Sequence, residues 1–194
     1  MENKIPGRAA LLIIDAQNGF IPSKTIATTV IDNISRLAEV ARKLNIPVLY
    51  SREIHRKELI DFGRELEGTE CLHCLENSEE IEIIEELYPQ ENDYVFTKRR
   101  YSCFKNTDLP YLLRGLRIDT LLICGFLTDV CVHYTSADAH QEDYYIRVAE
   151  DAVQGSSESA HSASLQAIKY LQRDAILSTD NLIRLIIDSN KAPV

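Results

Sequence analysis

The sequence predicts a three-layer α/β/α fold, in which a mainly parallel, Rossmann-like sheet of about six strands carries helices on both faces. Continuous apolar runs, the pattern of strands that are buried on both faces, recur along the chain. Segments with helical periodicity separate these runs, as in sheets whose parallel strands are joined by crossover helices. No repeat, low-complexity tract or Pro/Gly-rich linker interrupts the alternation, so we expect a single domain over residues 1–194.

Each element is placed by its own pattern. Strands are expected at residues 9–14, 46–50, 94–97, 120–125, 145–148 and 175–177. Helices are expected at residues 30–44, 79–87, 109–116, 130–140 and 162–171, and a last helix capped by residues 178–180 should run through residue 185. The connection over residues 51–78 is long for a compact domain, which is typical of segments that shape a pocket or a subunit contact.

The composition narrows the classes of function. The chain carries a formal net charge of -9 and no basic run longer than residues 98–100, which argues against nucleic-acid binding. No apolar run approaches the ~20 residues of a membrane-spanning helix, and residues 1–8 lack a signal-peptide pattern. Five cysteines suit a reducing cytoplasm better than a disulfide framework. We therefore expect a cytoplasmic protein with no membrane partner. The sequence contains no phosphate-binding glycine motif, so a nucleotide cofactor is not expected.

Residues with catalytic chemistry follow three of the predicted strands. Asp15 ends the first strand, Lys98 ends the third, and Cys131 lies where the helix after the fourth should begin. Ligands of open parallel sheets bind beyond the carboxyl ends of the strands, so these side chains are expected to converge. A nearby cation and a helix N-terminus lower the pKa of a thiol and make it nucleophilic. Each residue alone has an ordinary interpretation, as a turn aspartate, a solvated lysine and a core cysteine.

Three motifs resemble those of the isochorismatase-like cysteine hydrolases, the family that includes nicotinamidases and N-carbamoylsarcosine amidases. Residues 15–20 (DAQNGF) resemble its D-x-Q-x-x-F motif, residues 98–104 (KRRYSCF) its K-x-x-Y-S-x-F motif, and residues 125–132 (GFLTDVCV) its nucleophile segment G-x-x-T-x-x-C-V. The similarity extends over residues 9–167. Three motifs in the family's order form a specific signal.

The resemblance implies a catalytic triad of Asp15, Lys98 and Cys131 and a covalent thioester intermediate. It also implies a cis peptide before Leu127 and an oxyanion hole built from the amides of Leu127 and Cys131. Relatives that cleave isochorismate commonly lack the cysteine, so its presence favours hydrolysis of a C–N bond in a small amide, urea or carbamoyl substrate. The alternatives are a metal-assisted nicotinamidase, an isochorismatase-type hydrolase and a non-catalytic binding or assembly subunit.

The need for a metal stays open at the level of sequence. Glu53 and His55 resemble the D-x-H metal motif of nicotinamidases, and His73 lies where that group has another metal-binding histidine. Asp61, however, occupies the place of the remaining histidine. We expect catalysis without a required cofactor, with a divalent metal at Glu53, His55 and His73 as the alternative, because carboxylate and imidazole suit zinc or iron.

The motifs and the family resemblance also predict the substrate pocket and the assembly. We expect the pocket to be lined by residues near the motifs, namely Gln17, Phe20, Tyr101 and Phe126. Cys71 and Cys74 form one C-x-x-C pair, which cannot complete a structural zinc site, so we interpret them as incidental loop thiols. The family resemblance implies a homodimer or homotetramer acting on a small molecule.

Overall fold

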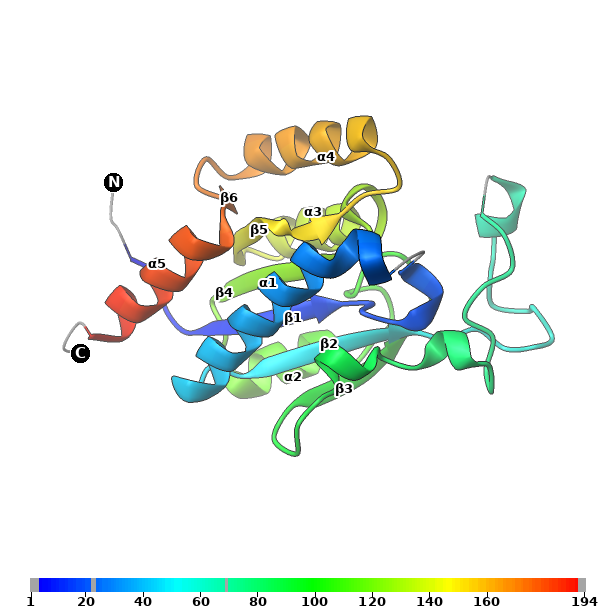
Figure 1. The fold of residues 1–194 in the computed structure, drawn as a ribbon, viewed down its shortest axis with the longest axis horizontal. Helices are drawn as coiled ribbons and strands as arrows, with labels where there is room; N and C mark the ends of the chain where they lie inside the picture. The colour runs from blue at the N-terminus through cyan, green and yellow to red at the C-terminus, as the bar shows by residue number, and fades with distance from the viewer. Residues whose placement is uncertain (1–3, 22–23, 69, 192–194) are drawn as a thin grey trace.

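The computed structural model describes residues 4–21, 24–68 and 70–191, and its centre is a six-stranded sheet in which every neighbouring pair is parallel. The strand order is β3-β2-β1-β4-β5-β6, and the sheet runs through the middle of the molecule (Figure 1). The strands are β1 (Ala9–Ile14), β2 (Val48–Glu53), β3 (Tyr94–Lys98), β4 (Thr120–Phe126), β5 (Tyr145–Gln154) and β6 (Ile176–Leu177). The predicted fold class is confirmed.

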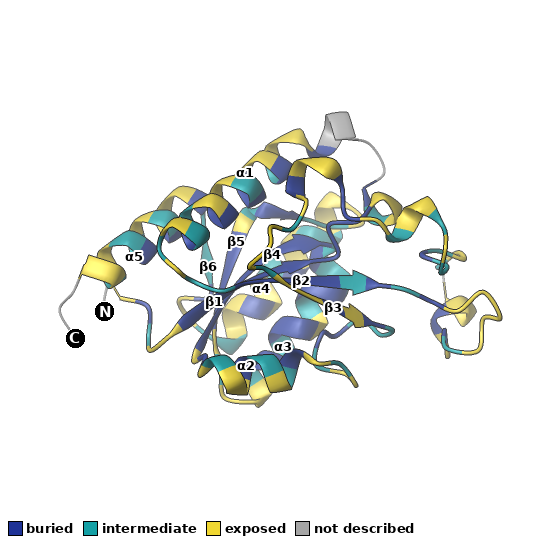
Figure 2. Ribbon diagram, turned by 90° about the horizontal axis from the view of Figure 1, so that it is seen from below, coloured by how far each residue is buried: buried dark blue, intermediate teal, exposed yellow. Residues whose placement is uncertain are grey.

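Helices cover both faces of the sheet. They are α1 (Lys24–Lys43), α2 (Leu109–Leu116), α3 (His133–Gln141), α4 (Glu158–Leu171) and α5 (Thr179–Lys191). One hydrophobic core joins α1 and α5 to one face of the sheet, and a second joins α2, α3 and α4 to the other. β1 alternates between the two cores and every one of its residues is buried. Figure 2 shows the buried strands between helices whose outer faces are exposed.

One predicted helix is wrong. Residues 79–87 form two short 3-10 helices, Glu79–Ile81 and Glu85–Leu87, in place of one α-helix. Between them, the carbonyl of Glu82 accepts from the amide of Asn18, and the amide of Ile84 donates to the carbonyl of Ala16. The chain here pairs with the segment that follows β1. These long-range backbone hydrogen bonds replace those that a local α-helix would make.

Other boundaries differ because tertiary packing extends the elements. α1 begins six residues before the predicted start, over a threonine-rich turn of weak helix propensity, and Ala27 of this turn is buried. The predicted helix at residues 130–140 is preceded by a π-helix, Thr128–Val132. β5 continues six residues beyond its predicted end, past a register shift against β4 between Ile123 and Gly125.

The long connection between β2 and β3, residues 54–93, projects beyond the sheet at the right of Figure 1. Its described residues, 54–68 and 70–93, form three short 3-10 helices, the first of them Glu65–Glu67, and no longer helix or strand. Its first part lies at the carboxyl ends of the strands, because it leaves directly from the end of β2. The predicted long loop is therefore positioned to shape a site at this edge.

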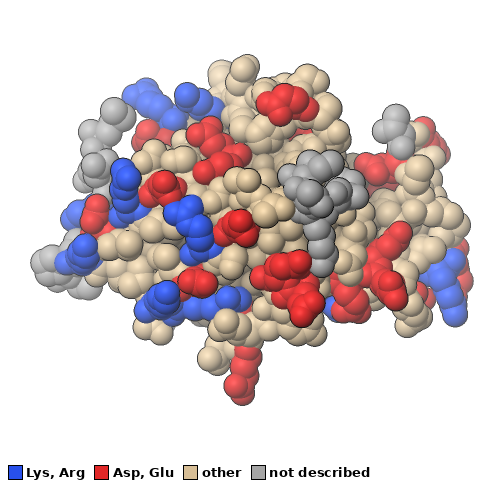
Figure 3. All heavy atoms as spheres, in the orientation of Figure 1, with Lys and Arg blue, Asp and Glu red and all other residues tan. Residues whose placement is uncertain are grey.

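On the face shown in Figure 3, basic side chains gather mainly at the left among acidic ones, and acidic side chains predominate toward the right. Among the described residues, no helix is long and apolar enough to cross a membrane.

Candidate active site

The carboxyl ends of β1 and β3 and the π-helix after β4 bring the three predicted catalytic side chains together. The Nζ of Lys98 lies 2.8 Å from Oδ2 of Asp15 and 3.3 Å from Sγ of Cys131. A carboxylate oxygen of Asp15 lies within 4.8 Å of the Cys131 sulfur. All three residues are buried, with exposed fractions of 0% for Asp15, 1% for Lys98 and 3% for Cys131. The predicted convergence of the three side chains is therefore seen in the structure.

Local hydrogen bonds hold the carboxylate in place. Asp15 follows β1 with a left-handed backbone, at φ 47°. The hydroxyl of Ser51 in β2 donates to its Oδ1 at 2.7 Å and accepts from its amide at 3.1 Å. Asp15 Oδ2 then remains to meet Lys98.

The π-helix that carries Cys131 is anchored to the start of α4 and to the segment just before it. Thr128, at its start, is fully buried, and its hydroxyl lies 2.9 Å from Nδ1 of His161 in α4. The carboxylate of Asp129 accepts from the amide and the hydroxyl of Ser156. The peptide bond between Phe126 and Leu127 is cis, as the family resemblance implied.

Burial disfavours the charged form of each triad residue. It raises the pKa of the Cys131 thiol well above its ordinary value, although the neighbouring Lys98 ammonium acts in the opposite direction. The expectation that the cation and the helix terminus would leave a low-pKa thiol is therefore wrong for the resting site. Burial also raises the pKa of Asp15, against the effect of Lys98. A more basic carboxylate is a better acceptor for the thiol proton.

A second carboxylate, which the sequence linked only to a metal, also reaches the triad. Glu53 ends β2 and is 1% exposed. Its Oε2 accepts a short hydrogen bond from Lys98 Nζ and lies 3.8 Å from Cys131 Sγ. Burial acts to raise the pKa of Glu53, but Lys98 and the hydrogen bonds from His55 and His73 outweigh it and hold the pKa well below its usual range.

Next to the triad, four side chains converge as metal ligands would. Glu53, His55, Glu65 and His73 each offer a ligand atom within 4.8 Å of the other three. Glu53 Oε1 lies 3.1 Å from Nε2 of His55 and 2.9 Å from Nε2 of His73. Glu65 was not singled out in the sequence, because nothing in its loop segment distinguishes it from the neighbouring acidic residues.

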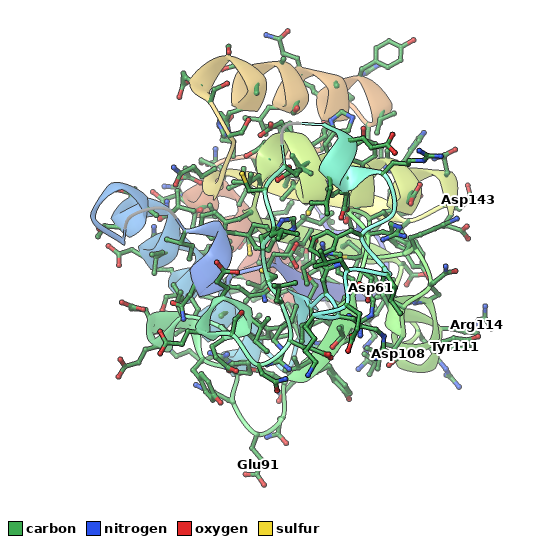
Figure 4. All side chains as sticks on the ribbon, turned by 90° about the vertical axis from the view of Figure 1, so that its right-hand side faces the viewer. Asp61, Glu91, Asp108, Tyr111, Arg114 and Asp143 are labelled. Atoms are coloured by element: carbon green, nitrogen blue, oxygen red, sulfur yellow. The ribbon has the colours of Figure 1, made fainter. Side chains whose placement is uncertain are left out.

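These residues fit a divalent metal. Both carboxylate oxygens of Glu65 are buried and lack a hydrogen-bond partner among the described residues, which is costly unless a ligand satisfies them. Two carboxylates and two imidazoles form a donor set suited to zinc, iron or manganese. Asp61 is not part of this group: its carboxylate pairs with Arg99 at 3.2 Å and accepts from the amide of Arg56. Figure 4 shows Asp61 in the loop in front of the strand ends.

A cavity of about 670 Å³ opens beside this group. Its lining comes from the long loop, from the segment after β3 and from α3, and includes Phe62, Glu65, Arg100, Tyr101 and Tyr134. The rings of Tyr101 and Tyr134 stack at a centroid distance of 5.7 Å. Burial and the nearby carboxylates of Glu65 and Glu70 raise the pKa of Tyr101 to about 12.

Of the four predicted pocket residues, Tyr101 alone lines this cavity. Phe126 is fully buried in the core, and Phe20 packs against His73 at a ring distance of 5.6 Å. Gln17 is also fully buried, and its side chain binds the backbone of Glu53 and Ile81. Its amide holds the chain at these two residues.

The two loop thiols behave differently. Cys71 is exposed and Cys74 is buried, and both are free. The carbonyl of Cys71 lies 2.7 Å from Nδ1 of His73 and so orients the imidazole whose Nε2 faces Glu53.

Comparison with known proteins identifies the family. A model of the isochorismatase domain matches residues 9–180, most of the chain. The chain belongs to the isochorismatase family. This confirms the resemblance of the three motifs, and the chain is an isochorismatase-like hydrolase.

Relatives within the isochorismatase family include amidases. Nicotinamidase 3 of Arabidopsis thaliana is 27% identical over 164 residues, which cover 84% of this chain and 81% of that protein. The ureidoacrylate amidohydrolase RutB of Acinetobacter baylyi is 29% identical, over 84% of this chain and 78% of that protein.

Solved structures of the isochorismatase family superpose closely. A cysteine hydrolase from Pseudomonas syringae pv. phaseolicola matches 94% of this chain and 93% of its own, with a TM-score of 0.85 and 28% identity. The pyrazinamidase of Pyrococcus horikoshii in complex with zinc matches with a TM-score of 0.78 and 25% identity, over 89% of this chain and 99% of its own.

Proposed function

We propose that this protein is a cysteine amidohydrolase that cleaves a C–N bond of a small amide, urea or carbamoyl substrate through a covalent thioester. One observation carries the proposal. The Lys98 ammonium lies between a buried carboxylate and a buried thiol, 2.8 Å from Asp15 and 3.3 Å from Cys131. A nucleophile, a proton acceptor and a cation that holds them together are the parts that acyl transfer to sulfur requires.

Each residue has a defined part in the reaction. Asp15 takes the thiol proton as the Cys131 sulfur attacks the substrate carbonyl carbon and forms the S–C bond. The amides of Leu127 and Cys131 stabilise the resulting oxyanion. As the C–N bond breaks, Asp15 returns the proton to the leaving nitrogen, which departs as ammonia or an amine. Water then attacks the thioester carbonyl with Asp15 as base, and the acid product leaves with Cys131 again a thiol.

A divalent metal on the four converging side chains is the second candidate feature. Glu53, His55, Glu65 and His73 would hold it, and the unpartnered buried oxygens of Glu65 favour its presence. Such an ion supplies Lewis-acid polarisation and orientation of a bound ligand. This observation favours a metal-assisted amidase over the metal-free amidase expected from the sequence alone.

The cellular setting is also part of the proposal. We infer a cytoplasmic enzyme, since its five cysteines are all free. A small molecule fits the cavity of about 670 Å³. The homodimer or homotetramer implied by the resemblance remains a prediction, and sedimentation of the purified protein would measure it.

The decisive experiment measures release of ammonia from nicotinamide, carbamoyl amino acids, biuret, ureidoacrylate and simple amides. Wild-type protein and the Cys131→Ala variant are compared with and without chelator, after circular dichroism has shown that both are folded. We expect turnover that requires Cys131, and a loss of turnover on chelation that added zinc or manganese restores.

Other outcomes have specific meanings. Turnover that Cys131→Ala retains would refute the thioester mechanism. Turnover that ignores chelator would remove the metal and leave the cysteine mechanism intact. No ammonia release from any substrate of the panel, combined with cleavage of isochorismate, would support the isochorismatase-type alternative. No turnover of the panel or of isochorismate would support a non-catalytic subunit.

A further inference from the structure

Glu53 lies where the triad and the imidazole cluster meet. It is the last residue of β2 and is directly opposite Lys98, the last residue of β3, in the register of the parallel pair. Residues that share a register position in neighbouring strands project from the same face of the sheet, about 5 Å apart. The sheet therefore sets this carboxylate beside the ammonium of the triad.

The two oxygens of Glu53 serve different groups. Oε1 faces Nε2 of His55 at 3.1 Å and Nε2 of His73 at 2.9 Å. Oε2 accepts from Lys98 Nζ and lies 3.8 Å from Cys131 Sγ. One side chain thus contacts both the candidate metal ligands and the candidate nucleophile.

The Lys98 ammonium donates hydrogen bonds to Glu53 Oε2 and Cys131 Sγ, and it forms an ion pair with Asp15 Oδ2 at 2.8 Å. Two carboxylates and the sulfur therefore surround the ammonium. Gln17 fixes the backbone of Glu53 in turn, because its Oε1 accepts from the Glu53 amide at 2.7 Å and its Nε2 donates to the Glu53 carbonyl at 2.9 Å.

We propose that Glu53 is a positioning residue for the triad, holding Lys98 against Cys131 with one carboxylate oxygen while the other belongs to the imidazole cluster. The proposal rests on the proposed function for the meaning of the triad. It extends that function by making the metal cluster and the nucleophile one connected unit, in which a change at Glu53 affects both.

The test separates the two contacts of this carboxylate. Glu53→Gln keeps the shape of the side chain and removes its charge. Glu65→Gln is the matched control, because Glu65 belongs to the same cluster and has no contact with Lys98. Both variants and wild type are stripped with chelator and folding is verified by thermal melting. Modification of Cys131 by iodoacetamide is then followed at one fixed pH by mass spectrometry of its peptide.

In the stripped proteins we expect Glu53→Gln to change the rate of Cys131 modification by about threefold or more and Glu65→Gln to leave it within about twofold of wild type. Metal content after reloading, measured by plasma mass spectrometry, should fall in both variants. Equal modification rates in Glu53→Gln and wild type would overturn the proposal. If Glu53→Gln fails to fold, Glu53→Asp, which keeps the charge and shortens the reach, replaces it with the same expected contrast.

Turnover gives an independent reading. On the best substrate of the panel, reloaded Glu53→Asp should lose roughly tenfold in kcat with little change in KM, because a residue that positions reacting groups acts on the chemical step. An unchanged kcat would overturn the proposal. If no substrate of the panel is turned over, the proposed function is refuted. The modification rates of Cys131 in Glu53→Gln and Glu65→Gln can still be compared, because that measurement needs no substrate.

Discussion

At the scale of single residues, the site consists of buried charges that stabilise one another. One ammonium faces two buried carboxylates, and the pKa of Lys98 is raised well above its usual range because Asp15, Cys131 and Glu53 outweigh the cost of burial. Buried ion pairs are costly to break, since the partner left behind has no water to solvate it. Substitutions in the triad are therefore expected to affect stability as well as any activity.

Lys98→Met tests this expectation. The substitution removes the ammonium that lies between Asp15 and Glu53, so we expect a loss of about 3–5 kcal/mol in the free energy of unfolding, measured by urea denaturation at pH 7. The double variant Lys98→Met/Glu53→Gln, which also removes the charge of Glu53, should recover part of the loss. A single variant as stable as wild type would contradict the argument.

The sequence was most informative about residues that follow strands, and in the loop it pointed to His55 and His73 but not to Glu65. Asp15, Lys98 and Cys131 could be found because the ends of parallel strands must meet at one edge. The contact of Glu53 with Lys98 depends on the register between β2 and β3, which no local pattern specifies. Glu65 depends on the path of a long loop without regular structure, so it could be found only in three dimensions.

At the scale of elements, polar contacts fasten α1 to the sheet beside the apolar core. Arg42 of α1 donates to the hydroxyl of Tyr50 in β2 at 3.0 Å and pairs with Asp93, just before β3, at 2.6 Å. Tyr50 is 1% exposed, and burial raises its pKa to about 12 despite the neighbouring Arg42. The folded protein thus keeps the Tyr50 proton to higher pH than the unfolded chain.

This shift predicts alkaline destabilisation. The unfolded chain loses the tyrosine proton near pH 10 while the folded state retains it up to about 12, so stability present below pH 10 should decline through this window by about 2–3 kcal/mol. Urea denaturation between pH 9 and 12 should show that the free energy of unfolding declines less steeply with pH in Tyr50→Phe than in wild type. Tyr170→Phe, at an exposed tyrosine, is the control and should follow wild type. Identical slopes for Tyr50→Phe and wild type would count against the effect.

Elements were predictable where local pattern and tertiary packing agree. Every predicted strand is present, because a run that is apolar on both faces has few alternatives in a sheet covered on both sides. The predicted helix at residues 79–87 failed because its backbone found partners in residues 16–18, far away in sequence. The same pairing holds the loop against the site.

At the scale of the whole molecule, a bound metal should tie the long loop to the sheet. His55, Glu65 and His73 all belong to the connection between β2 and β3, whereas Glu53 belongs to the sheet itself. An ion shared among them binds only the folded protein, so its binding free energy adds to stability.

Thermal melting measures this contribution. Zinc or manganese at about 100 times its dissociation constant should stabilise chelator-stripped protein by about 2.7 kcal/mol, which for a chain of this size raises Tm by roughly 5–10 °C. Glu65→Ala should reduce the shift. Glu67→Ala, on the same 3-10 helix and at an exposed residue, should retain it. A shift that is equal in Glu65→Ala and wild type would exclude Glu65 as a ligand.

The central pairing of the sheet has a consequence for synthesis of the protein. β1 and β4 lie side by side, with Leu11 opposite Leu122, yet more than a hundred residues separate them along the chain. Gly125 completes this contact at φ 118°, where an added side chain would meet the Ile14 backbone. A ribosome must therefore release most of the chain before β1 finds its partner, and pairings of such long range form slowly. Until then Asp15 lies apart from Cys131, and the candidate site is complete only after β4 and the π-helix beyond it have docked.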